Sequence, residues 1–178
     1  MKFTKLAAAI TLALAVSAAQ AATATDNFNV KITITGTCAG AAFTSNATSD
    51  VVFTAQTAAV TTPALQATNN AGTRLAVACS KNTPFAIGLL PANASTTGLG
   101  AMSNGTDTIQ YQLRQPTVAF APAYTVNWGN TAGTNDFSAS GTGLANTLNI
   151  PVQATIAANL LDVSAGAYTE AVTATLTY

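Results

Sequence analysis

The stretch FNVKITITGTC, residues 28–38, decides the fold class because apolar and polar side chains alternate along it. Its apolar positions are Phe28, Val30, Ile32 and Ile34, and Asn, Lys and Thr residues stand between them. A period of two is typical of a β-strand with one apolar face. A strand near a chain end often has an unpaired edge. The sequence therefore raises the question of which core this face enters.

The first 21 residues have the features of a secretory signal peptide. Lys2 and Lys5 precede a short, Ala-rich apolar run, and Ala-Gln-Ala ends at Ala21. The run is too short and too rich in Ala for a good membrane anchor, and no later run reaches membrane-spanning length. We expect cleavage before Ala22, or a residue or two away, and an exported, soluble chain without membrane insertion.

The mature chain carries few charges. Removal of the leader leaves 157 of 178 residues, enough for one domain with a real core. Four basic residues then face six acidic ones, which argues against nucleic acid and anionic lipid as partners. The polar surface is made by Thr, Asn and Ser, which suits packing beside copies of the same chain. A compositional habit of the source organism explains it nearly as well.

The chain has two cysteines, Cys38 and Cys79, and no histidine. In an oxidising compartment a Cys38–Cys79 disulfide is favoured, and two cysteines allow one connectivity. Closing a loop of about 40 residues stabilises a fold by about 4 kcal/mol in the chain-entropy model. Two thiols without histidine give too few ligands for a metal site.

Strand patterns dominate the rest of the chain. Short β-rich segments alternate with Gly, Asn, Ser and Pro clusters, which is typical of an all-β sandwich or barrel. We predict one domain without repeats. The predicted strands are Asp50–Ala55, Thr73–Cys79, Pro84–Leu90, Asp107–Leu113, Tyr124–Trp128, Thr147–Ile156 and Tyr168–Tyr178.

The last predicted strand also has one apolar face, formed by Val172, Ala174, Leu176 and Tyr178. Thr fills most of the alternate positions. We expect this strand to be the last of the domain, with an empty position beside it in the sheet. If the strand at residues 28–34 of one copy fills that position in another copy, both unpaired strands are covered. Such strand addition joins two different surfaces and propagates without closing.

No constellation of catalytic residues is visible. The absence of histidine removes the commonest general base and every Ser-His or Cys-His arrangement. The six acidic residues are scattered, and no phosphate-binding loop occurs. Trp128, followed by Gly129, is more often a core residue than a ligand platform. We expect no enzymatic activity and no cofactor.

Several motifs together resemble the spore coat protein U domain family, and within it the Csu-type major pilins of the archaic chaperone–usher pathway. The resemblance covers the whole mature chain. Its motifs are NVKITITGTC, LAVAC ending at Cys79, IQYQL (Ile109–Leu113), NWG (Asn127–Gly129) and the closing GAYTEAVTATLTY from Gly166. The segment YQLRQPTVAF departs from the middle motif of the Csu-type subfamily.

The resemblance implies an incomplete immunoglobulin-like β-sandwich that lacks its final strand and is completed by donor-strand complementation. Residues 1–21 would be the signal peptide, 22–34 the donor segment and 35–178 the pilin domain. A periplasmic chaperone would lend a strand beside the last strand, and exchange for the next subunit's donor would follow at an outer-membrane usher. The chain would thus be a subunit of an extracellular surface pilus that supports adhesion and biofilm formation.

The resemblance also assigns residues to these roles. Donor residues would be Phe28, Val30 and Ile32, whereas Ile34 could serve either the neighbour or its own domain. The acceptor groove and chaperone-binding strand would contain Val172, Ala174, Leu176 and Tyr178, and the Tyr178 carboxylate would meet a basic residue of the chaperone. Cys38–Cys79 would join the first strand to a later one.

Three other interpretations stay open from the sequence. The chain could be a minor or adaptor pilin, or a spore-coat-like surface protein with the same domain. It could instead be a carbohydrate-binding β-sandwich in which Tyr111, Tyr124 and Trp128 stack on sugars. A secreted enzyme is the least favoured interpretation.

Overall fold

The computed structural model of the chain describes residues 28–39, 50–69, 75–117 and 123–178. The predicted signal peptide, residues 1–21, lies outside the described residues, as does the start of the mature chain up to residue 27. The chain divides into two compact units, Met1–Ile34 and Thr35–Tyr178.

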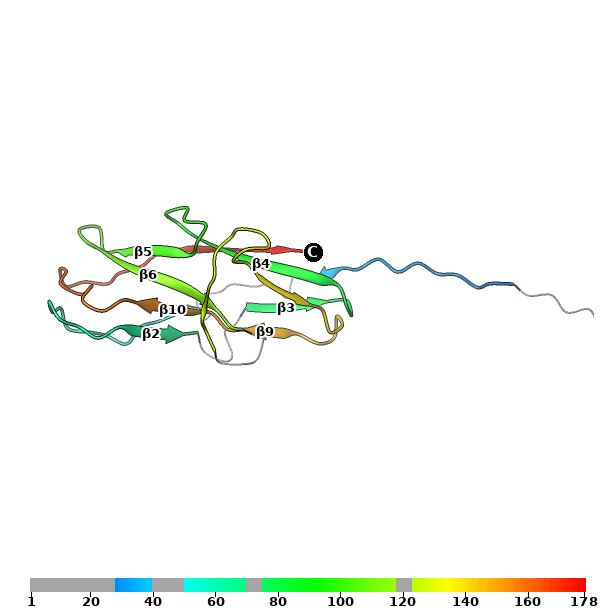
Figure 1. Ribbon diagram of the computed structural model, residues 1–178, viewed down its shortest axis with the longest axis horizontal. Helices are drawn as coiled ribbons and strands as arrows, with labels where there is room; N and C mark the ends of the chain where they lie inside the picture. The colour runs from blue at the N-terminus through cyan, green and yellow to red at the C-terminus, as the bar shows by residue number, and fades with distance from the viewer. Residues whose placement is uncertain (1–27, 40–49, 70–74, 118–122) are drawn as a thin grey trace, which may run out of the picture. The chain divides into compact units, whose positions relative to one another are not determined.

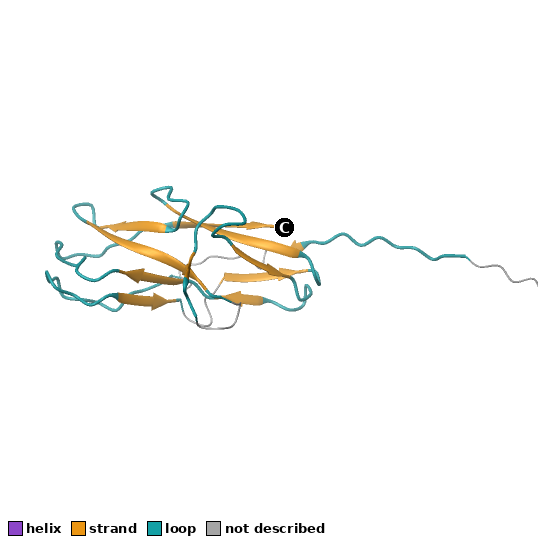
Figure 2. Ribbon diagram, in the orientation of Figure 1, coloured by secondary structure: helices purple, strands orange, loops and turns teal. Residues whose placement is uncertain are grey.

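In its described part, the second unit contains strands, turns and loops but no helix (Figures 1 and 2). The predicted all-β class is therefore confirmed. The strands are β1 (Cys38–Ala39), β2 (Leu65–Thr68), β3 (Leu75–Cys79), β4 (Pro84–Pro91), β5 (Leu99–Ser103), β6 (Thr108–Gln115), β7 (Val126–Asn127), β8 (Phe137–Ser140), β9 (Leu148–Ile150), β10 (Gln153–Ile156) and β11 (Val172–Thr177).

The strands form three antiparallel sheets. The sheet orders are β1-β3-β9, β2-β10-β6-β5 with β7 also on β6, and β11-β4-β8. β2 pairs with β10 in one sheet, and β3 pairs with β9 in another. The segment that contains β2 and β3 therefore runs alongside the segment that contains β9 and β10. β11 pairs with β4 over its full length, from Val172 opposite Pro91 to Thr177 opposite Ala86.

The strand predicted over residues 147–156 is interrupted between β9 and β10. Pro151 lies at the break, and proline has no N–H to donate to a sheet. Asn69 holds the break together, because its Oδ1 accepts the N–H of Val152 at 2.9 Å and its own N–H donates to the Val152 carbonyl at 3.1 Å. Asn69 is buried, so these bonds satisfy backbone groups that water does not reach.

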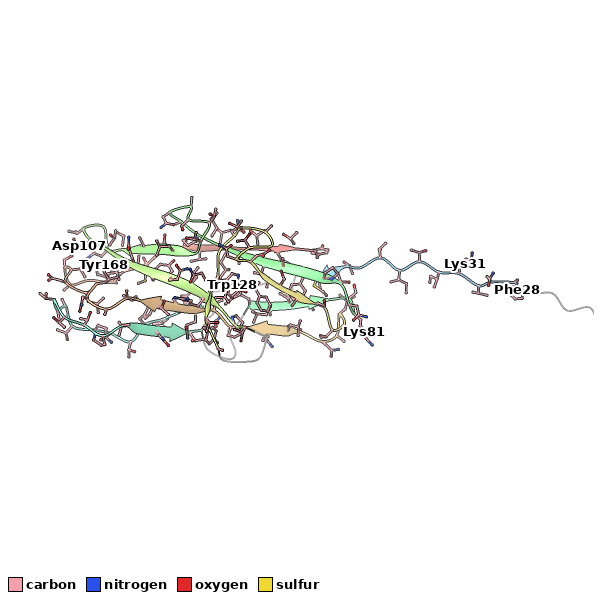
Figure 3. All side chains as sticks on the ribbon, viewed as in Figure 1. Phe28, Lys31, Lys81, Asp107, Trp128 and Tyr168 are labelled. Carbon is pink, nitrogen blue, oxygen red and sulfur yellow. A yellow bond between two sulfur atoms is a disulfide. The ribbon has the colours of Figure 1, made fainter. Side chains whose placement is uncertain are left out.

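The core contains Trp128, which is fully buried (Figure 3). Its indole N–H donates to the Ile87 carbonyl at 2.8 Å, and its ring lies 5.6 Å from that of Phe137. The prediction that Trp128 is a core residue is confirmed. The ring is buried and its one polar group, the indole N–H, has a hydrogen-bond partner, as a stable core tryptophan requires.

Two sequence predictions about strands are wrong. Asp50–Ala55 forms no strand, although burial still alternates along it, and the strand predicted over Tyr124–Trp128 is reduced to the two residues of β7. Three strands, β2, β5 and β8, lie outside the predicted strands. These strands are short and carry few large apolar residues, so the pairing partner rather than local sequence determines them.

Candidate functional site: an apolar groove beside the last strand

β11 is the edge strand of its sheet in the described structure. It is bonded to β4 on one side, and no strand of the described residues pairs with its other side. An unpaired edge presents free N–H and C=O groups that can bind another strand. The strand is therefore a place where an additional strand could be added.

The four residues predicted on the apolar face of β11 differ in exposure. Ala174 and Leu176 are partly buried and pack against the core. Val172 is 37% exposed and Tyr178 is 64% exposed. A face with this pattern is only partly covered by its own domain.

A groove of about 820 Å³ opens next to β11. Val172 and Ala174 line it, whereas Leu176 and Tyr178 do not. Its floor contains buried residues of the other strands, namely Leu89, Ile109, Leu113, Ala154 and Ile156. Protein interiors are normally packed without voids much larger than a water molecule. A hollow of this size against core side chains is space that the described residues leave unfilled.

Residues 50–58 supply another part of the groove wall. Val51 and Phe53 are partly buried and pack against the core, and Val52 between them is 75% exposed. Burial thus alternates as in a strand, but the described chain gives residues 50–55 no strand partner. The groove is consequently lined by β11 and by residues 50–55, and no described strand lies between these two stretches.

Glu170 fixes the chain that leads into β11. Its carboxylate accepts the N–H of Ala101 at 2.7 Å and the N–H of Asn93 at 3.2 Å. It also bonds the hydroxyl of Tyr111, and burial, followed by this carboxylate, raises the pKa of Tyr111 above its ordinary value. One side chain thereby ties the entry of β11 to β5, to β6 and to the turn after β4.

Gly100 makes this arrangement possible. A Cβ at Gly100 would clash with the Tyr111 side chain and would lie 2.5 Å from the Glu170 carboxylate. Real Cβ atoms do not approach so closely, so any larger residue would displace the Tyr111–Glu170 pair. The glycine is required here by a close approach rather than by its backbone angles.

A second set of bonds holds the loop before β11. Thr169 and Ser103 exchange two backbone hydrogen bonds of 3.1 Å, which place this loop beside β5. The Tyr168 hydroxyl donates to the Ser164 carbonyl at 2.7 Å, and Ser164 N–H donates to Asp107 at 2.8 Å. Hydrogen bonds from Ser164 lower the pKa of Asp107. The groove wall that β11 provides is thus anchored before the strand begins.

In the first unit, residues 28–34 form neither helix nor strand. Phe28, Val30, Ile32 and Ile34 are 86, 89, 85 and 81% exposed, and Lys31 between them is exposed as well (Figure 3). Soluble proteins seldom leave a continuous row of large apolar side chains in water unless the row binds something. This row has the alternation of a strand and no core in the described chain.

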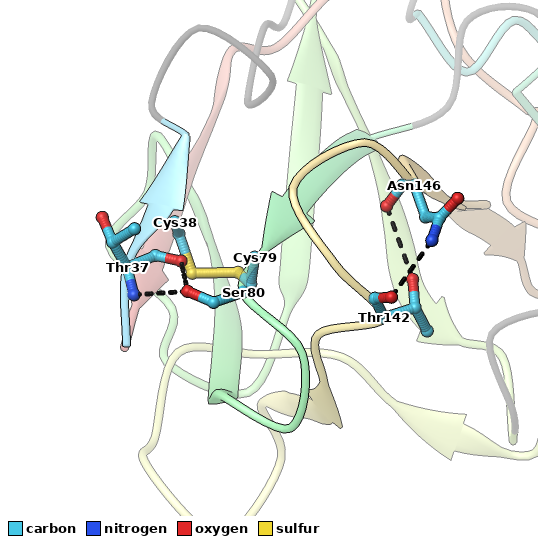
Figure 4. The surroundings of a disulfide bond; sticks show 6 residues. All are labelled: Thr37, Cys38, Cys79, Ser80, Thr142 and Asn146. Atoms are coloured by element: carbon cyan, nitrogen blue, oxygen red, sulfur yellow. Dashed lines mark hydrogen bonds between the residues drawn. A yellow bond between two sulfur atoms is a disulfide. The ribbon is translucent and has the colours of Figure 1, made fainter. Parts of the chain in front are cut away.

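The predicted disulfide between Cys38 and Cys79 is confirmed (Figure 4). The two cysteines are direct partners in the β1–β3 pairing, and both are buried. Beside them, Thr37 N–H donates to Ser80 Oγ at 2.7 Å, and Ser80 N–H and Oγ–H each donate to the Thr37 carbonyl at 2.8 Å. These bonds attach the start of the second unit firmly to β3.

The aromatic residues considered for sugar stacking do not form an open platform. Trp128 is 0% exposed and Tyr111 is 5% exposed. A ring that stacks on a sugar must present a face to solvent, so this pair is unavailable. The burial of two of the three rings removes the basis of the carbohydrate-binding interpretation.

The sequence pattern did not identify Val51, Phe53 and Glu170 as part of this site. Val51 and Phe53 stood in a predicted strand, but nothing in the sequence placed that strand beside the groove. Glu170 belongs to the closing motif and is one of the six scattered acidic residues, and its sequence neighbours do not mark it as a site residue. In the described part of the chain, no group of three His, Cys, Asp or Glu residues could hold a metal ion, and no helix could span a membrane.

Comparison with known proteins shows the family of the chain. No curated protein is matched by the sequence. Among solved structures, a chain of the CsuC–CsuE chaperone–tip adhesion subunit pre-assembly complex, from archaic chaperone-usher Csu pili of Acinetobacter baumannii, is similar at 17% identity and a TM-score of 0.40. The match covers 82% of this chain and 40% of that one, so this chain spans less than half of its length. The family model of the Spore Coat Protein U domain matches residues 24–175, and the chain belongs to this family.

Proposed function

We propose that the protein is a structural subunit of a surface pilus assembled by the chaperone–usher pathway. The N-terminal segment, residues 22–34, acts as a donor strand that fills the groove beside β11 of the neighbouring subunit. A periplasmic chaperone occupies the same groove before assembly, and an outer-membrane usher receives the subunit. Family membership and the sequence resemblance to Csu-type pilins support the assembly route.

The observation that carries the proposal is a complementary pair of surfaces in one chain. The second unit has an apolar groove of about 820 Å³ beside an edge of β11 with which no described strand pairs. The first unit has a row of alternating apolar side chains with exposures of 81–89%. A strand from another copy would satisfy both, since its backbone would pair with β11 and its apolar face would enter the groove.

The free energy available is sufficient for assembly. Burying the four side chains Phe28, Val30, Ile32 and Ile34 contributes about 6–12 kcal/mol, at about 1.5–3 kcal/mol each. Each backbone hydrogen bond to β11 adds about 1 kcal/mol. Lost freedom of association costs about 4–15 kcal/mol, so stable fibres require that most of the face be buried.

The mode of association is open-ended. The donor row and the acceptor groove are different surfaces, so the contact is heterologous and every added subunit brings a new groove or donor. The product is a linear polymer rather than a closed ring or dimer. A pilus subunit acts through its mechanical and surface properties, and the proposed function assigns it no catalytic step.

Substitutions on the two faces of the donor row test the proposal. Val30→Asp puts a charge on the apolar face, and Asn29→Asp puts the same charge on the opposite face one residue away. We expect Val30→Asp to abolish fibres in electron micrographs and to elute as a monomer in gel filtration. Asn29→Asp should assemble like the unmodified chain.

Deletion of residues 26–34 should also leave a chain that does not polymerise. Normal fibres from Val30→Asp and from the matching Ile32→Asp variant would overturn the donor assignment. Equal loss of fibres in Val30→Asp and Asn29→Asp would also contradict it, because the effect would then be one of charge and not of the apolar face.

A further inference from the structure

We infer that Lys31 of the inserted strand pairs with Asp50 at the rim of the neighbour's groove, and that this ion pair sets the register of insertion. The inference rests on the proposed function and goes beyond it, since it names the residues that select one alignment of the two chains. Apolar alternation alone selects it only weakly, because a shift of two residues still brings an apolar residue to three of the four inward positions.

Lys31 is the lone charged residue in residues 28–37. It stands between Val30 and Ile32, so in a strand it points away from the face that carries them. Its side chain is exposed. When the apolar face enters a groove, the ammonium group is left at the rim, where it meets whatever charge the acceptor presents.

The groove presents negative charge. Asp50 and Glu170 line it, and the described lining residues contain no lysine or arginine. Glu170 is occupied, because its carboxylate already accepts two backbone N–H groups and bonds Tyr111. Asp50 is exposed and makes no polar contact with the described part of the chain. The free carboxylate at the rim is therefore that of Asp50.

The two charges belong to matching faces. Asp50 and Val52 are exposed, whereas Val51 and Phe53 between and after them are partly buried against the core. An inserted strand with Val30 and Ile32 inward places Lys31 on the same side as Asp50. A shift of one residue would drive Lys31 into the apolar groove, which is costly for an ammonium group. A shift of two residues would keep the apolar contacts but separate Lys31 from Asp50.

Charge reversal in the full mature chain tests the pair. Each copy carries both residues, so Lys31→Glu or Asp50→Lys breaks every interface and the double variant restores an ion pair of opposite orientation. We expect each single variant to slow fibre growth about three- to ten-fold at low salt. The double variant should recover to within about two-fold of the original chain. Raising the salt concentration to about 1 M should shrink these differences, since it screens exposed charges.

The matched controls are Lys81→Glu and Asp162→Lys, which reverse exposed charges that do not line the groove. Fibre growth should be unchanged in both. Equal rates for the single variants and the original chain would overturn the inference. Additive rather than compensating losses in the double variant would overturn it as well, because Lys31 and Asp50 would then act separately.

Cross-linking gives the register directly. A chain with Lys31→Cys and Asp50→Cys should form a ladder of disulfide-linked polymers on a non-reducing gel, because disulfides require Cα atoms within about 7 Å. Lys31→Cys with Asp162→Cys should form no ladder. If fibres form and depend on Val30 but the first of these double variants gives no ladder, the register inference fails while the proposed function stands. If Val30→Asp and Ile32→Asp both still form normal fibres, the donor assignment of the proposed function fails.

Discussion

Glu170 offers the sharpest test of how the groove is built. We predict that Glu170→Gln destabilises the domain, because a carboxylate that accepts N–H groups from both Ala101 and Asn93 becomes an amide with one acceptor and one donor end. One N–H would then face the amide NH₂ group. A hydrogen bond to a charged group contributes about 1.5–3 kcal/mol, so we expect a loss of about that size in the free energy of unfolding.

Urea unfolding followed by tryptophan fluorescence measures this loss. Trp128 is the single tryptophan and is fully buried, so its emission reports the core. All samples should carry Val30→Asp, which prevents assembly. This substitution does not disturb the domain, because Val30 is 89% exposed. For a slope near about 2 kcal/mol/M, the midpoint should fall by about 1 M.

Asp162→Asn is the matched control, because it makes the same carboxylate-to-amide change at an exposed side chain. It should leave the midpoint unchanged. Equal midpoints for Glu170→Gln and Asp162→Asn would refute the reasoning, because Glu170 would then contribute no more than a solvated acid. A changed slope in place of a changed midpoint would show that the denatured or native state, and not the hydrogen bonds, had altered.

Two further predictions concern the disulfide and pH. Replacing Cys38 and Cys79 together by Ala opens a loop of 41 residues and should cost about 4 kcal/mol in the same urea assay; an unchanged midpoint would contradict the chain-entropy estimate. Folding raises the pKa of Tyr111. The stability that its protonated hydroxyl contributes is therefore present below the unfolded pKa of about 10 and is lost as the pH rises beyond that value. Tyr111→Phe should therefore flatten the stability loss above about pH 10; an alkaline profile identical to that of the unmodified chain would argue against the Tyr111 assignment.

Local alternation made several features predictable from the sequence. The rows at residues 28–34 and 172–178 could be recognised because a period of two survives without knowledge of the neighbours. The Cys38–Cys79 bond could be predicted because the sequence has two cysteines and a predicted signal peptide, and the structure places the two cysteines as direct strand partners. These features depend on composition and short-range pattern alone.

The groove could not be predicted from the sequence because it is made by contacts between distant parts of the chain. Glu170 reaches Ala101 and Asn93, which lie 69 and 77 residues away. β5 and β8 lie in Gly-, Ser- and Thr-rich stretches, where propensity is weak and pairing with β6 and β4 decides the conformation. The strand predicted over Asp50–Ala55 has the right alternation but lacks a partner among the described residues of its own chain, which is the situation expected if the partner comes from another copy.

Hydrogen exchange of assembled fibres tests the central claim most directly. Residues 28–34 have no strand partner in the described structure, so their amides should exchange rapidly in a monomeric chain. If this segment fills the groove of a neighbour, the same amides become strongly protected in fibres, together with amides of β11. Fibres in which residues 28–34 still exchange as fast as in the monomer would contradict donor-strand assembly.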